Sequence, residues 1–105
     1  MLTVQQIKDT VTDYFKDKPV KSVYLFGSYA RGEAKEDSDV DLLLDLDYDK
    51  SIGLEFARWW IVLEKKFKTK VDLVPTDTVY PKVMKNAEKD KILLYQIQFI
   101  NANNK

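Results

Sequence analysis

The feature that most restricts the fold of this chain is the run Asp39-Val-Asp-Leu-Leu-Leu-Asp-Leu-Asp47. Successive side chains of a β-strand point to opposite faces, so the run divides into two sets. The first set is apolar and the second is rich in carboxylates: Val40, Leu42, Leu44 and Leu46 against Asp39, Asp41, Leu43, Asp45 and Asp47. We therefore predict a strand over 39–47 with one apolar face and one carboxylate-rich face.

Helices and strands alternate in the first half of the chain. Thr3 and Gln6 have the spacing of a capping box, and apolar residues then recur at helical intervals, which predicts a helix over 4–16. A β-branched and aromatic segment predicts a strand over 22–26 that stops at Gly27. We expect Ser28 to cap a short helical turn that runs through Arg31 and ends at Gly32.

The second half continues the alternation. Ser51 is the expected N-cap of a helix to about 68, with apolar residues along one stripe, and 70–74 is a short strand ended by Pro75. Pro81 suits the first turn of a helix to about 90, and a last strand is expected over 92–96. The fold class is α/β or α+β, a three- or four-stranded sheet flanked by helices.

Length and composition limit the functions that this chain can have. The 105 residues fit one domain, 1–105, with a frayed tail over 100–105. Without Cys or His there is no disulfide, thiol nucleophile, thiolate metal site or imidazole base, so catalysis must use carboxylates, Lys, Arg, hydroxyls, backbone groups and metals. The 17 basic residues balance the 17 acidic ones, which argues against direct nucleic-acid binding. The apolar runs are too short to span a membrane, so we expect a cytoplasmic protein.

Three acids indicate metal-dependent chemistry. Asp39 and Asp41 lie two positions apart on one strand face, where their carboxylates repel each other unless a cation joins them. Mg²⁺ takes one or two protein carboxylates together with substrate phosphates. Asp72 lies within the apolar strand 70–74 and would complete a three-carboxylate site if the two strands are neighbours. The set favours phosphoryl or nucleotidyl transfer.

Gly27 and Ser28 follow the first strand, where glycine permits close backbone approach and free N–H groups with the Ser hydroxyl can bind phosphate. Arg31, three residues later, has a planar fork suited to a triphosphate. Each feature alone has a simpler interpretation: a turn, a solvated strand face, an ion-paired acid or a surface charge. The combination of all of them carries the functional prediction.

The motif Gly27-Ser28, ten residues, Asp39-Val40-Asp41 resembles the signature of the DNA polymerase β-like nucleotidyltransferases. The stretch from Phe26 to Ala34, with Lys35 to Leu44, looks most like the minimal nucleotidyltransferases, or MNT proteins. This resemblance implies a mixed sheet with Asp39, Asp41 and Asp72 on one open face. Asp39, Asp41 and Asp72 would be the catalytic and Mg²⁺-binding residues.

The resemblance also implies a substrate and a partner. Gly27 and Ser28 would hold the triphosphate of ATP, with Arg31 neutralising its charge. MNT proteins act as antitoxins of HEPN-domain toxins and can transfer AMP to a tyrosine hydroxyl of the toxin. We therefore expect a protein adenylyltransferase in a hetero-oligomer with a HEPN toxin.

Two alternatives stay open at this point. The chain could neutralise its partner by binding alone, or act on a small molecule or nucleic acid with an acceptor pocket from another subunit. The chain ends about 30 residues after Asp72, which leaves little room for an acceptor site, and every alternative needs a partner. Trp59, Trp60 and the apolar segment 92–100 either complete the core or form a contact surface.

Overall fold

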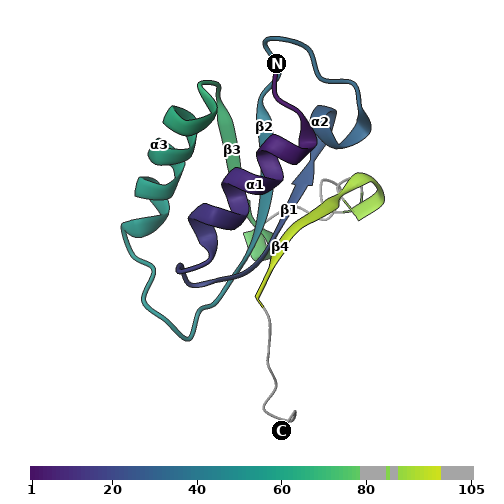
Figure 1. The fold of residues 1–105 in the computed structure, drawn as a ribbon. Helices are drawn as coiled ribbons and strands as arrows, with labels where there is room; N and C mark the ends of the chain where they lie inside the picture. The colour runs from purple at the N-terminus through teal and green to yellow at the C-terminus, as the bar shows by residue number, and fades with distance from the viewer. Residues whose placement is uncertain (79–84, 86–87, 98–105) are drawn as a thin grey trace, which may run out of the picture.

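The computed structural model describes residues 1–78, 85 and 88–97. Figure 1 shows helices packed against a twisted sheet. The elements follow in the order α1 (Val4–Phe15), β1 (Val20–Phe26), α2 (Gly27–Arg31), β2 (Val40–Leu46), α3 (Glu55–Phe67), β3 (Val71–Pro75), the 3-10 turn η1 (Thr76–Thr78) and β4 (Ile92–Gln96). The predicted alternation of helices and strands is confirmed over this part of the chain.

The sheet has four strands in the order β3-β2-β1-β4. The strand β1 is antiparallel to both β2 and β4, whereas β2 and β3 are parallel. A parallel pair needs a crossover connection, and α3 provides it. The prediction of a mixed sheet is therefore confirmed, and its strand order makes the two acid-bearing segments neighbours.

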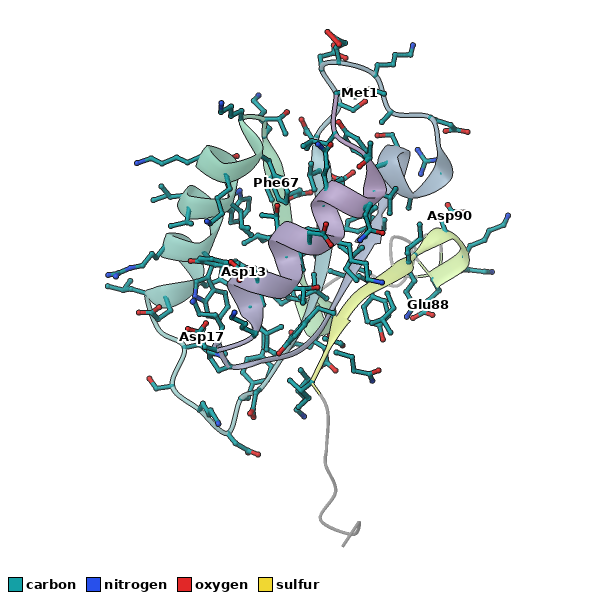
Figure 2. All side chains as sticks on the ribbon, viewed as in Figure 1. Met1, Asp13, Asp17, Phe67, Glu88 and Asp90 are labelled. Atoms are coloured by element: carbon teal, nitrogen blue, oxygen red, sulfur yellow. The ribbon has the colours of Figure 1, made fainter. Side chains whose placement is uncertain are left out.

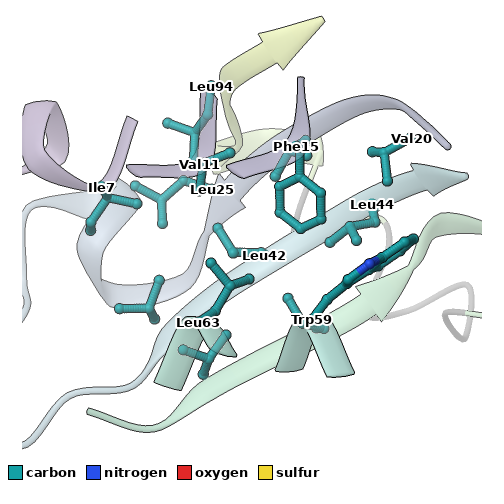
Figure 3. Packing of buried hydrophobic residues seen from close by; sticks show 14 of the residues in the cluster. Ile7, Val11, Phe15, Val20, Leu25, Leu42, Leu44, Trp59, Leu63 and Leu94 are labelled. Atoms are coloured by element: carbon teal, nitrogen blue, oxygen red, sulfur yellow. The ribbon is translucent and has the colours of Figure 1, made fainter. Parts of the chain in front are cut away.

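The core lies between the sheet and the two long helices α1 and α3, which cover the same face (Figure 1). Figure 3 shows the packing, in which the rings of Phe15 and Trp59 meet edge to face with centroids 5.6 Å apart. The predicted apolar face of β2 is confirmed, because its four members all lie in this cluster: Val40, Leu42, Leu44 and Leu46. The carboxylate-bearing face of β2 therefore points away from both helices.

The start of α1 follows the predicted capping box. The Gln6 backbone N–H donates to Thr3 Oγ1 at 3.0 Å, and the Thr3 N–H donates to Gln6 Oε1 at 2.8 Å. Two N–H groups that the first turn would leave unpaired are thereby satisfied. The helix then buries Ile7, Val11 and Phe15 against the sheet.

The helix α3 begins later than predicted, at Glu55, with Leu54 rather than Ser51 as its N-cap. Gly53 has a φ of +48°, and this left-handed backbone is incompatible with a helix that starts at Ser51. Lys68 is also left-handed, with a φ of 56°, and caps the helix by donating its N–H to the Glu64 carbonyl. Lys68 therefore ends the helix instead of extending it.

Other boundaries differ by small amounts. The cap of α2 is Phe26 and not Ser28, which lies inside the helix, whereas Gly32 closes it as predicted. Pro75 belongs to β3 instead of ending it, and an edge strand tolerates a residue without an N–H.

The last part of the chain is described in pieces. The strand predicted over 92–96 is confirmed as β4. Of the helix predicted from Pro81 to about 90, only Lys85 and residues 88–90 are described, and they are helical. The predicted frayed tail lies outside the described residues. Among those described, no helix has the length and apolar character needed to cross a membrane.

Candidate active site

Asp41 and Asp72 lie side by side on the open face of the sheet. They are register partners in the parallel ladder of β2 and β3, whose backbones in such a ladder are about 4.8 Å apart. Their neighbours along each strand point the other way, into the core, as Val40, Leu42 and Leu73 show. The structure therefore brings two of the predicted acids together, and Asp39 stands immediately before β2.

Asp41 carries the strongest electrostatic perturbation of the site. Its pKa is raised to about 6, first because partial burial removes water from the carboxylate, then because Asp72 and Asp39 repel its negative charge. Arg31 acts in the opposite direction and lowers the pKa of Asp41. All three predicted acids and Arg31 are thus electrostatically coupled, and a bound cation would stabilise the charged form of Asp41.

Gly27 is the residue that makes room for Asp41. Its φ is +76°, and a Cβ atom at this position would overlap Asp41 Oδ2 and lie 3.1 Å from Asp41 Cγ. Phe26, the residue before it, is the register partner of Asp41 across β1 and β2. From the sequence we expected Gly27 to let a phosphate approach the backbone closely. In the structure, the group that approaches the Gly27 backbone closely is the carboxylate of Asp41.

Ser28 lies half-buried in the first turn of α2. Its carbonyl accepts a hydrogen bond from the Glu33 N–H at 2.9 Å, which closes the end of the short helix. Within the described part of the chain, no side chain caps the first turn of α2. The N–H groups of this first turn therefore lie beside Gly27 and the acids. This is where the sequence predicted that phosphate binds.

Arg31 is held at the rim of the site by two acids. Its Nε donates to Glu33 Oε1 at 2.9 Å, and its Nη1 lies 3.9 Å from Asp90 Oδ2. The hydrogen bond that Arg31 donates to Glu33 is the main reason that the pKa of Arg31 is raised, with smaller contributions from Asp90 and Asp41. Figure 2 shows Asp90 on the segment before β4, on the side of α2. Neither acid was predicted from the sequence, and Asp90 is 59 positions from Arg31.

Asp72 is exposed, although the apolar residues around it suggested a buried strand. The reason is topological: β3 is an edge strand, and the long helices α1 and α3 cover its other face. Leu43 differs from expectation in the opposite direction: it is buried although it lies on the carboxylate-rich face of β2. Burial on the open face is therefore uneven and leaves Asp72 accessible.

The donor set fits a hard divalent cation, because it consists of carboxylate oxygens. Within residues 1–78, 85 and 88–97, no three acidic side chains are gathered closely enough to hold a metal ion by themselves. Mg²⁺ does not need such a cage, since it is usually bound by one or two carboxylates with substrate phosphates and water. Asp41 with Asp39 or Asp72 meets that requirement.

Residues 4–94 match the nucleotidyltransferase domain family. The chain belongs to that family. It is 39% identical over 98 residues to a Methanocaldococcus jannaschii protein, MJ1379, provisionally named a protein adenylyltransferase, with 88% of this chain and 98% of that protein covered. It is 35% identical over 96 residues to the protein adenylyltransferase MntA of Thermococcus cleftensis, with 88% and 96% covered.

Solved structures agree with the fold. A structure provisionally described as a minimal nucleotidyltransferase is 30% identical, with a TM-score of 0.71, and 85% of this chain and 90% of that chain are covered. A chain in the Shewanella oneidensis complex of a tri-AMPylated HEPN toxin with its MNT antitoxin has a TM-score of 0.67 at 19% identity, with 90% and 73% covered. The resemblance of the sequence motif to minimal nucleotidyltransferases is confirmed, and this nucleotidyltransferase has the fold that they share.

Proposed function

We propose that this nucleotidyltransferase is a Mg²⁺-dependent protein adenylyltransferase that transfers AMP from ATP to a tyrosine hydroxyl of a HEPN toxin and thereby acts as its antitoxin in the cytoplasm. The observation that carries the proposal is the register pairing of Asp41 with Asp72, with Gly27 making room for the carboxylate of Asp41. The names of its relatives, which include protein adenylyltransferases, supply the acceptor class.

We assign each residue a role that agrees with where it lies. Asp39 and Asp41 hold the metal, and Asp72 completes the site and accepts the proton of the attacking hydroxyl. When bound, Mg²⁺ supplies charge stabilisation for the phosphoryl oxygens. The acceptor oxygen forms a bond to the α-phosphorus, the bond to the bridging oxygen breaks, and pyrophosphate leaves. Gly27 and Ser28 orient the β- and γ-phosphates through their backbone N–H groups and the Ser28 hydroxyl.

Arg31 lies close enough to the acids to lower the pKa of Asp41, and its guanidinium already binds Glu33 and Asp90. Its exposed position lets it exchange one of these weak surface pairs for a phosphate oxygen. In the proposed reaction Arg31 therefore neutralises the triphosphate at the rim and does not touch the reacting hydroxyl.

The acceptor is a protein in this proposal because relatives that are 39% and 35% identical to this chain are named protein adenylyltransferases, the first of them provisionally. A HEPN toxin would bring its own surface and present its tyrosine at the open face of the sheet. The complex of a HEPN toxin with an MNT antitoxin in Shewanella oneidensis supports this choice of partner.

The experiment is AMP transfer from labelled ATP to the HEPN toxin proposed as the partner, with Mg²⁺ and then with a chelator. We expect labelling that needs the metal and is lost in the Asp39→Asn, Asp41→Asn double variant. Labelling that persists in the double variant would refute the assignment of the acids. Substituting each tyrosine of the toxin with Phe identifies the acceptor.

A second candidate is an antitoxin that neutralises its partner by binding alone. The observation in its favour is that Arg31 already binds two acids and is not directed at an empty phosphate site. In that case the double variant would form the complex and neutralise the toxin as well as the wild-type chain does. The same variant therefore distinguishes the two candidates.

A further inference from the structure

Two side chains of α3 bind the backbone of the residue that precedes Asp72. The indole Nε1–H of Trp60 donates to the Val71 carbonyl at 2.6 Å, and the Val71 N–H donates to Glu64 Oε2 at 3.1 Å. Trp60 and Glu64 lie four positions apart, one helical turn, so they project from the same side of α3. Together they bind both polar backbone groups of a single residue.

Val71 is the register partner of Val40, but within the described part of the chain no strand lies on its other side. The Val40 N–H donates to the Lys70 carbonyl at 2.9 Å, so Lys70 faces β2. Backbone groups alternate in direction along a strand, and those of Val71 therefore point outward from the edge of the sheet. An edge strand leaves such groups open to water or to another chain. Trp60 and Glu64 take the place of the missing neighbouring strand.

The same alternation directs the backbone groups of Asp72 toward β2, where Asp41 is its register partner. The start of β3 is thus held from two sides: by β2 at Lys70 and Asp72, and by α3 at Val71. We propose that Trp60 and Glu64 are positioning residues, which fix β3 at Val71 and so hold the carboxylate of Asp72 beside Asp41. This inference rests on the proposed function for the role of Asp72.

Trp59, the preceding residue, shows what a tryptophan in α3 does without this contact. It is fully buried in the core, and its indole Nε1 has no hydrogen-bond partner within the described residues. Trp60 is only half-buried and packs against Phe56, with ring centroids 6.0 Å apart. The two adjacent tryptophans therefore have different roles: Trp59 fills the core, and Trp60 hydrogen-bonds to the backbone of the edge strand.

The kinetic test uses Trp60→Phe and Glu64→Ala, with Trp59→Phe as the matched control. We expect Trp60→Phe and Glu64→Ala to lower kcat for AMP transfer by about tenfold, since small displacements of a catalytic group are costly, and to change KM for ATP by less than about twofold. Glu64→Gln keeps a carbonyl acceptor for the Val71 N–H and should recover most of kcat. Trp59→Phe should lower the unfolding midpoint but leave kcat of the folded protein within about twofold of wild type.

A second readout needs no substrate. The ¹⁵N order parameter of the Asp72 amide should fall from a rigid value of about 0.85 toward 0.6 in Trp60→Phe and Glu64→Ala, and stay rigid in Glu64→Gln and Trp59→Phe. If the wild-type chain transfers no AMP, the proposed function fails, while the order parameters still decide whether Asp72 is positioned in this way. An unchanged order parameter at Asp72, or an unchanged kcat in a chain that does transfer AMP, would overturn the inference.

Discussion

Replacing Gly27 by Ala tests the contact on which the geometry of the site depends. The chain offers a matched control in Gly32, because both glycines have a positive φ, +76° and +73°. A Cβ at Gly27 would overlap the Asp41 carboxylate, whereas a Cβ at Gly32 would meet nothing within 4 Å. The two substitutions therefore share the backbone penalty and differ only in the contact with Asp41.

The expected changes in the free energy of unfolding follow from the backbone penalty and from the contact with Asp41. A left-handed conformation costs an L-residue about 1–2 kcal/mol, and the loss of glycine's freedom in the unfolded chain returns about 0.4–1 kcal/mol. Gly32→Ala should therefore lower the free energy of unfolding by about 1 kcal/mol. Gly27→Ala adds the cost of displacing Asp41, about 1–3 kcal/mol, for a total of about 2–4 kcal/mol.

The assay is urea unfolding followed by the fluorescence of Trp59 and Trp60, in the wild-type and Asp41→Ala backgrounds. Truncating Asp41 removes its carboxylate and leaves its Cβ, 3.3 Å from the added methyl group. The cost of Gly27→Ala should then fall to about that of Gly32→Ala, which gives a coupling of about 1–3 kcal/mol. Equal costs for Gly27→Ala and Gly32→Ala in the wild-type background would refute the reasoning, and so would the absence of coupling.

Two further predictions concern pH and the end of α3. The pKa of Asp41 in the folded chain is about 6, above its usual value of about 4 in an unfolded chain, so the folded state binds the proton more tightly. Without metal, protonated Asp41 stabilises the folded state below about pH 4, and this stabilisation is lost as pH rises through about 6. Thermal unfolding measured against pH should show this loss of stability in the wild-type chain. Asp41→Asn should remove the loss. Lys68→Gly should keep the free energy of unfolding, measured in urea, or raise it by up to about 1 kcal/mol, because Lys68 caps α3 with a φ of 56°. A clear loss of stability in that variant would mean that the Lys68 side chain makes a contact worth more than the relief of backbone strain.

The sequence was informative where a single periodic pattern decides the outcome. The alternation in Asp39–Asp47 predicted which residues of β2 are buried in the core, because side-chain direction in a strand has a period of two. The capping box at Thr3 and Gln6 predicted the start of α1, because both of its hydrogen bonds are local. The family motif also depends on local spacing, and the family is confirmed.

Contacts between distant residues could not be predicted in this way. Nothing in the spacing indicates that Asp90 approaches Arg31, since the contact depends on how the segment before β4 packs beside α2. Trp60 was expected only to complete the core or form a contact surface, and Glu64 was not singled out. Their hydrogen bonds to Val71 follow from β3 being the edge strand. The exposure of Asp72 has the same origin, because strand order decides which faces the helices cover.

We propose that the carboxylates beside Gly27 catalyse transfer of AMP to a partner protein. The most direct measurement is the intact mass of the HEPN toxin proposed as the partner after incubation with ATP and Mg²⁺, with this chain either wild type or carrying Asp39→Asn and Asp41→Asn. We expect a toxin heavier by one or more AMP groups with the wild-type chain and an unmodified toxin with the double variant. An unmodified toxin with the wild-type chain, in a complex that still neutralises it, would show that these carboxylates do not transfer AMP to the toxin.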